Sequence, residues 1–139
     1  MPAAIAPLLI ALASFVLRLM NLGSTKGYIF DEVYYVDGAR DLLKYGVEVT
    51  GSNPEFIVHP PVGKWLIAVG IAIFGDNEFG WRFATALIGT ILILVFARLV
   101  HVLFYSPLLT GLGAALMALD GLLLVHSRTA LLDLFLTFF

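Results

Sequence analysis

The sequence predicts an all-α integral membrane protein that crosses the bilayer several times. Of its 139 residues, 60% are hydrophobic and only 13% are charged, and the mean hydropathy is +0.98. A soluble domain of this length needs a largely polar exterior, and the residues for one are missing. Long apolar runs alternate with polar segments, and the first run lacks the basic start and the cleavage site of a signal peptide. We therefore expect that first run to be an uncleaved membrane helix.

Charge and cysteine content exclude several classes of partner and site. The net charge is −2, which gives no reason to expect a nucleic-acid partner. The absence of cysteine excludes disulfides and thiolate metal sites. The last residues, up to Phe139, lie within an apolar run without a stop signal, so we interpret the chain as part of a longer polytopic protein.

Four apolar runs predict membrane-spanning helices. The first covers about 3–22, and about 20 helical residues cross a hydrocarbon core of about 30 Å. The others are expected at about 79–97, at 108–126, and at 130–139, where a fourth crossing begins. A polar external loop at 23–78 separates the first two spans.

Two surface helices are expected within this loop. Apolar residues recur at helical spacing over 32–45, with charged residues on the opposite side, which indicates an amphipathic helix. The apolar run Trp65–Phe74 would extend only about 15 Å as a helix, half of a bilayer core. We therefore predict a short interfacial helix at about 62–75, which begins after Pro60 and Pro61.

Counting the crossings places the candidate site residues on one membrane face, outside if the first span runs outward. Arg98 would then lie inside, in weak agreement with the positive-inside rule. The residues expected to share the external face are Asp31, Glu32, His59, Arg82, Arg128 and Asp133.

The acidic residues on this face have two interpretations each. Asp31 and Glu32 could supply a general base and a neighbouring charge, or they could cap the surface helix. Asp133 lies in an apolar run, where an ionised carboxylate needs a cavity or a partner such as Arg128. Asp120 is interpreted as a packing or pairing residue within the third span.

The basic residues suit a lipid phosphate, although each could instead be an interfacial anchor. They are His59, Lys64, Arg82 and Arg128. Aromatic residues such as Tyr34, Tyr35, Trp65 and Trp81 are interpreted as members of the interfacial belt.

Four short motifs in order carry a family resemblance. They are Phe30-Asp31-Glu32-Val33-Tyr34-Tyr35, His59-Pro60-Pro61-Val62-Gly63-Lys64, Gly75-Asp76-Asn77-Glu78-Phe79-Gly80-Trp81-Arg82, and Ser127-Arg128 with Leu131-Leu132-Asp133. Together they resemble the N-terminal part of protein O-mannosyltransferases, especially the bacterial type that uses polyprenyl-phosphate-mannose.

This resemblance implies a fold, a reaction and a set of roles. The fold would be the polytopic helical GT-C type of lipid-phosphate-sugar-dependent glycosyltransferase. Mannose would pass from polyprenyl phosphate to Ser or Thr hydroxyls of exported proteins with inversion, with Asp31 as base and Glu32 beside it. His59, Lys64, Arg82, Arg128 and Asp133 would bind substrate. The site would face the outside of a bacterial plasma membrane, or the lumen of the endoplasmic reticulum in a eukaryote.

A divalent cation and three other functions stay open. Carboxylate oxygens of Asp31 and Asp133 suit magnesium, manganese or calcium. Other lipid-linked sugar transferases, such as the aminoarabinose type, share the acidic pair and the later acid. A non-enzymatic transport subunit or a structural membrane protein would also contain buried charges. Only the transport subunit predicts charges at several depths, whereas most acids here cluster at one face.

Overall fold

The computed structural model describes residues 4–51, 53–54 and 59–139, and this part of the chain is mostly helical. Val49 pairs with Pro54 in a small antiparallel hairpin, which the sequence analysis interpreted as an irregular link. The elements are α1 (Ile5–Leu19), α2 (Glu32–Tyr45), β1 (Val49–Thr50), β2 (Asn53–Pro54), α3 (Val62–Phe74), α4 (Glu78–Phe104), α5 (Pro107–Leu119), α6 (Gly121–His126) and α7 (Asp133–Phe138).

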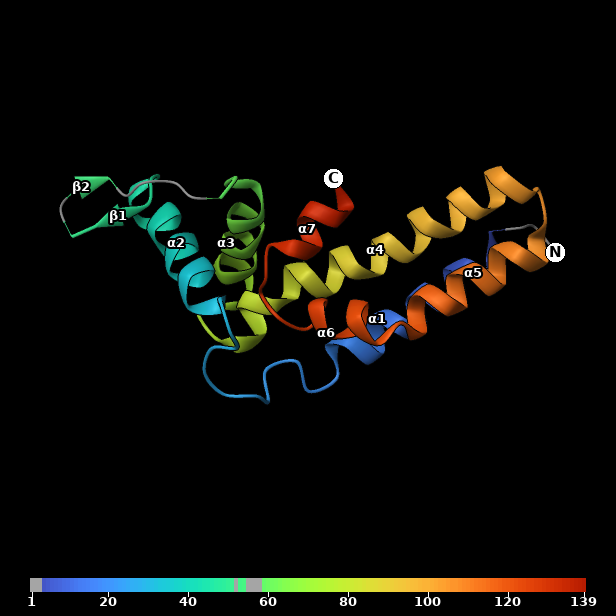
Figure 1. Ribbon diagram of the computed structural model, residues 1–139. Coiled ribbons are helices and arrows are strands. Elements are labelled where there is room, and N and C mark those ends of the chain that lie inside the picture. Colours follow the sequence, from blue (N-terminus) through green and yellow to red (C-terminus); the bar gives the residue numbers. More distant parts are fainter. Residues whose placement is uncertain (1–3, 52, 55–58) are drawn as a thin grey trace.

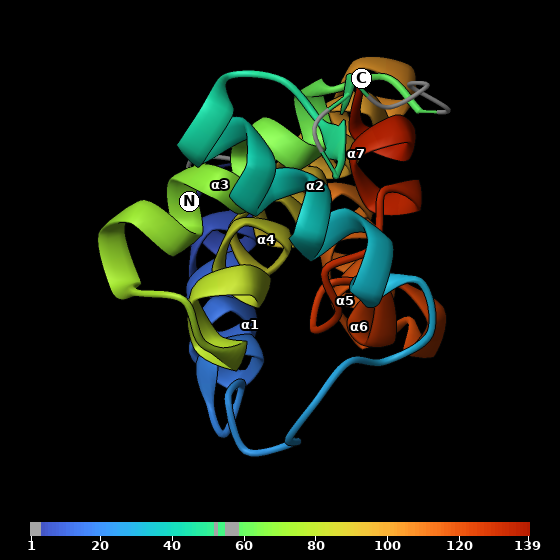
Figure 2. The same cartoon turned by 90° about the vertical axis from the view of Figure 1, so that its left-hand side faces the viewer.

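The long helix α4 organises the other elements along its length (Figure 1). Helices α1 and α5 run beside one part of α4, and both contact it and each other. Helices α2 and α3 pack together near the start of α4, with the hairpin beyond them (Figures 1 and 2). Helix α7 contacts both α3 and α4, so the last described segment returns to the end of the molecule that holds α2.

The helices in the predicted external loop occupy the expected residues. Helix α2 has the predicted bounds, and it ends at Gly46, whose φ of 76° is readily adopted only by glycine. Helix α3 begins directly after Pro61 and ends before Gly75, within one residue of the predicted range. Their position at a membrane surface stays a prediction.

Helix α4 is longer than the span predicted at 79–97. Asn77 caps its start, because the side-chain oxygen accepts hydrogen bonds from the backbone N–H of Phe79 and Gly80, both at 3.1 Å. No Pro or Gly follows Gly89 until Pro107, so the helix continues through Arg98 and His101 to Phe104. In the described part of the chain, α4 alone is long and apolar enough to cross a membrane by length and composition.

The third predicted span, 108–126, is interrupted. Helix α5 ends at Leu119, and Asp120 begins α6 by accepting a hydrogen bond from the backbone N–H of Leu123 at 2.7 Å. Asp120 is therefore a cap at a helix break, and its interpretation as a packing residue within a continuous helix is wrong. Helices α1 and α5 are apolar but have only 15 and 13 residues.

Two glycines allow backbones to approach closely where the helices cross. A Cβ on Gly70 of α3 would lie 2.3 Å from the carbonyl oxygen of Gly80 in α4. A Cβ on Gly89 would lie 2.5 Å from Cβ of Ser127, beside the buried Arg18 of α1. The first contact fixes α3, and with it α2, against the start of α4.

Candidate active site

Asp31 lies at the start of α2 with its carboxylate free of the helix. Its backbone oxygen accepts hydrogen bonds from the N–H groups of Tyr34 and Tyr35, but its side chain makes no capping bond. The interpretation of Asp31 as a side-chain cap is therefore wrong. The half-buried carboxylate instead borders a cavity.

This polar cavity has a volume of about 750 Å³ and lies between α2, the hairpin and the start of α3. Asp31, His59 and Lys64 all line it, so three of the predicted site residues come together there. The other lining residues are Tyr34, Tyr35, Asp37, Gly38, Arg40, Asp41, Glu48, Val49, Thr50 and Gly51.

A second, mostly apolar cavity of about 300 Å³ adjoins the first. Tyr35 and His59 line both cavities and therefore form the wall that they share. Asp133 borders the apolar cavity at the start of α7 and is exposed. Its remaining lining comes from α3, α7 and the residues beside them: Pro60, Val62, Gly63, Leu132, Phe135, Leu136 and Phe139.

Tyr35 is the central side chain of this arrangement, and the sequence analysis did not select it. Its ring is 7% exposed and meets the His59 ring edge-on, with centroids 5.4 Å apart. Burial raises the pKa of the Tyr35 phenol, and the negative charges of Asp31 and Asp133 raise it further. The phenol therefore stays protonated and can donate a hydrogen bond to a carboxylate. Its position four residues after Asp31 was the available signal, since residues at that spacing share a helix face.

Glu32 and Arg82 form a buried ion pair. Both side chains are at most 1% exposed, and the guanidinium donates to both carboxylate oxygens at 2.8 and 2.7 Å. Arg82 also donates to the backbone oxygens of Leu22, Thr25 and Gly27. These contacts use all five N–H donors of Arg82, which leaves none for a phosphate.

Glu32 is equally well engaged. It accepts hydrogen bonds from the backbone N–H of Ile29 at 2.8 Å and of Ala130 at 2.7 Å. The pair thereby ties the start of α2 to α4, to the preceding loop and to the segment before α7. This geometry favours a positioning role for both residues over direct contact with substrate.

Lys64 is paired with Glu48, a partner that the sequence analysis did not predict. Both side chains are 6% exposed. A Cβ on Gly38 would lie 2.9 Å from the Glu48 carboxylate, so the glycine makes room for the pair beneath α2. Lys64 therefore borders the cavity as a neutralised cation.

Arg128 does not form the local pair with Asp133 that was one alternative. It donates instead to the backbone oxygens of Leu17, Arg18 and Met20 at the end of α1. These carbonyl groups have no partner within the helix, so Arg128 satisfies them. Asp133 therefore reaches the cavity without this cation beside it.

Arg40 fixes the outer face of α2. It donates two hydrogen bonds to Asp76, at 2.8 and 2.9 Å, and lies over the Trp81 ring. Trp81 Nε1 donates to the same carboxylate at 2.7 Å. The hydrogen bond from Arg40 holds the pKa of Asp76 below its usual value, and the one from Trp81 lowers it further. Trp81, assigned to the aromatic belt from sequence, is thus a buried contact.

The described residues include no group of three or more His, Asp or Glu side chains that could hold a metal ion. The charges of Asp31 and Asp133 both act on Tyr35, so the two acids belong to one site. A cation there would need further oxygen ligands from substrate phosphate and water. The divalent ion stays a prediction.

Taken together, the two cavities can accommodate an amphiphilic ligand. The polar cavity offers a carboxylate base and hydrogen-bonding groups, and the apolar cavity offers room for a hydrocarbon chain. A half-buried carboxylate beside both can remove a proton from a hydroxyl group held between them.

Comparison with known proteins gives matches over most of the chain. Residues 58–139 match the model of a family described as dolichyl-phosphate-mannose-protein mannosyltransferase. A polyprenol-phosphate-mannose–protein mannosyltransferase of Mycobacterium tuberculosis is 47% identical over 94% of this chain, which corresponds to 26% of that protein. The protein of the same name from Corynebacterium glutamicum is 37% identical over 94% of this chain and 27% of its own length.

A more distant relative differs in its sugar. An undecaprenyl phosphate-alpha-4-amino-4-deoxy-L-arabinose arabinosyl transferase of Pseudomonas fluorescens is 41% identical, but over only 50% of this chain and 13% of its own. No solved structure matches the chain. The chain spans about a quarter of the length of the curated mannosyltransferases that it matches.

Proposed function

Because this chain belongs to the dolichyl-phosphate-mannose-protein mannosyltransferase family, we propose that the whole protein moves mannose from polyprenyl phosphate to Ser or Thr hydroxyls of exported proteins. The mannosyltransferases named among its relatives use such a lipid donor and a protein acceptor. The observation that carries the proposal is the position of Asp31, on a polar cavity that adjoins an apolar one.

The division into two cavities corresponds to the two parts of the donor. The apolar cavity between α3 and α7 would hold the first isoprene units, and the polar cavity would hold the mannosyl phosphate and the acceptor hydroxyl. His59, on the wall between them, would donate a hydrogen bond to the phosphate. Lys64 would contribute positive charge only to the extent that Glu48 leaves it available.

The reaction would be a direct displacement. The acceptor oxygen attacks the anomeric carbon as Asp31 takes the hydroxyl proton, and the bond from that carbon to the phosphate oxygen breaks. The leaving lipid phosphate keeps the bonding electron pair, and attack from the opposite side inverts the anomeric centre. Tyr35 would orient the Asp31 carboxylate, and Asp133 would face the donor from the apolar side. A divalent ion, if one binds there, would supply positive charge to the phosphate.

Glu32 and Arg82 would act by positioning. Their ion pair holds the backbone before α7 through Ala130 and the loop before α2 through Gly27. Both segments carry candidate site residues, Asp133 and Asp31. We therefore propose that the pair sets the distance between the two acids, and that Arg128 acts similarly by fixing the end of α1.

The proposed location follows from the same argument. The whole protein would be a multi-pass protein of the bacterial plasma membrane, with the site at the external face. The GT-C fold would be completed by later helices that this chain does not contain.

The experiment uses the full-length protein in lipid nanodiscs with two donors. One is polyprenyl-phosphate-mannose with a Ser/Thr-rich peptide, and the other is undecaprenyl-phosphate-aminoarabinose with a lipid acceptor. Mannosylation of the peptide alone is the expected result. Transfer of aminoarabinose without mannosylation would instead assign the protein to the more distant relatives' activity.

A further inference from the structure

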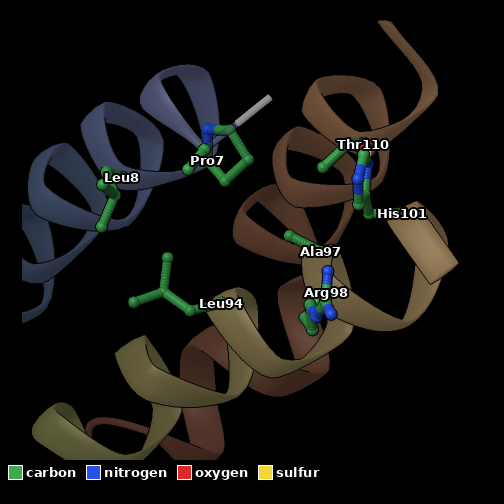
Figure 3. A pocket seen from close by; sticks show the side chains of 8 residues that line it. Pro7, Leu8, Leu94, Ala97, Arg98, His101 and Thr110 are labelled. Atoms are coloured by element: carbon green, nitrogen blue, oxygen red, sulfur yellow. Dashed lines mark hydrogen bonds between the residues drawn. The ribbon is translucent and has the colours of Figure 1, made fainter. Parts of the chain in front are cut away.

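A third cavity lies far from the candidate site, toward the other end of α4. Its volume is about 430 Å³, and it is formed by α1, α4 and α5 (Figure 3). Arg98 follows Arg82 by 16 positions in one helix, a separation of about 24 Å along the axis. The cavity therefore lies about one bilayer core away from the cavities that contain Asp31.

The lining of this cavity is apolar on one side and cationic on the other. Pro7 and Leu8 of α1 face Leu94 and Ala97 of α4, while Arg98 and His101 lie farther along α4 (Figure 3). Arg98 is exposed, and none of the hydrogen bonds found among the described residues involves its guanidinium.

No acidic side chain balances these cations. The sequence contains no Asp or Glu from Met1 to Phe30 or between Glu78 and Asp120, which includes every residue of α1 and α5 and nearly all of α4. His101 is held toward the cavity by Thr110, with 3.2 Å between Nδ1 and Oγ1. The charge at this end is thus positive and accessible, beside a groove for a hydrocarbon chain.

We propose that this cavity binds an anionic phospholipid of the opposite leaflet. The phosphate would accept hydrogen bonds from Arg98, with His101 beside it, and the first part of an acyl chain would lie against Pro7, Leu8 and Leu94. An anionic headgroup is the complement of a cationic rim without acids. This site is separate from the proposed transfer reaction and would anchor α1 and α4 at that leaflet.

The test uses full-length protein in nanodiscs that contain diazirine-labelled phosphatidylglycerol or diazirine-labelled phosphatidylcholine. After illumination, the cross-linked peptides are identified by mass spectrometry. We expect peptides from the starts of α1 and the end of α4 to be labelled about five-fold more by the anionic lipid, since one basic residue near a membrane surface contributes that much. The preference should disappear in Arg98→Gln and persist in Lys44→Gln, which removes an exposed cation at the other end.

Two outcomes would overturn the proposal. Equal labelling by the two lipids would mean that the groove contacts bulk lipid without recognising charge. No labelling by either lipid would mean that later helices of the protein cover the groove. The comparison of lipids on the unchanged protein does not depend on the folding of any variant.

Discussion

At the scale of single residues, the site depends on which charges are free and which are already paired. Glu32, Arg82 and Lys64 are buried in ion pairs, whereas Asp31 and Asp133 are not. Ion-paired groups that are fully hydrogen-bonded hold a structure in place, while a free carboxylate on a cavity can take a proton. Tyr35 connects the two free acids, because both of their charges act on its phenol.

Tyr35→Phe tests this connection. The ring and its contact with His59 remain, but the hydroxyl that can donate to Asp31 is lost. A hydrogen bond to a charged group is worth about 1.5 kcal/mol, so we expect kcat for mannosyl transfer to fall about ten-fold. The KM for the donor should change little. Tyr45→Phe, at the exposed end of the same helix, should leave kcat unchanged, and an equal fall in both variants would contradict a special role for Tyr35.

Arg82→Met tests the buried pair. The substitution leaves the Glu32 carboxylate buried without its cation, which costs about 3–5 kcal/mol. Thermal unfolding of the full-length protein in detergent should show a large decrease in stability. Lys44→Met, at a fully exposed cation, should unfold near the temperature of the unchanged protein. A small effect of Arg82→Met would mean that Arg82 is free for substrate.

At the scale of elements, the cavities exist because α2, α3 and α7 are fixed against the start of α4. Asn77 begins α4, Arg40 and Asp76 join α2 to that corner, and Gly70 lets α3 approach α4 at backbone distance. An element held by so few close contacts is sensitive to added volume.

Gly70→Ala should therefore displace α3. The added Cβ would lie 2.3 Å from the backbone oxygen of Gly80, which cannot move as a flexible side chain would. We expect a loss of about 1–3 kcal/mol in stability, together with weaker donor binding as the cavity walls shift. Gly121→Ala is the matched control, because nothing lies within 4 Å of a Cβ there. Equal stabilities of the two variants would argue against the close crossing.

At the scale of the whole molecule, the account places the candidate site and the Arg98 cavity on opposite membrane faces. The chain contains no cysteine, so single substitutions report on topology directly once any cysteines elsewhere in the protein are replaced. In intact cells, a membrane-impermeant maleimide should label Lys26→Cys, whereas Tyr105→Cys should react only after permeabilisation. Labelling of both in intact cells would contradict the crossing of α4.

Sequence patterns predicted the helices better than their ends and contacts. The bounds of α2 and α3 followed from Gly46, Gly75 and the prolines before α3, which act locally. The break at Asp120 was missed because a polar residue in an apolar run can cap a helix as well as pack within one. The extension of α4 was missed because charged residues were taken as a span boundary, although they do not end a helix.

The candidate site shows the same division. The grouping of Asp31, His59 and Lys64 on one side followed from counting crossings. The partners Glu48 for Lys64 and Glu32 for Arg82 join residues 16 and 50 positions apart, and no local pattern specifies such pairs. The sequence therefore predicted which residues carry charge near the site but not which charges are neutralised.

The most direct test of the central claim compares Asp31→Asn with Asp41→Asn in the full-length protein. Both acids line the polar cavity, but the Asp41 carboxylate accepts a hydrogen bond from the backbone N–H of Val49 and is not proposed as the base. Transfer of radiolabelled mannose from polyprenyl phosphate to a Ser/Thr peptide is measured alongside the Kd for the donor. The account predicts that Asp31→Asn lowers kcat by about 10²–10⁴-fold, the usual contribution of a general base, while donor Kd stays within about three-fold. An Asp31→Asn protein that transfers mannose at the rate of Asp41→Asn would contradict the assignment of Asp31 as the base.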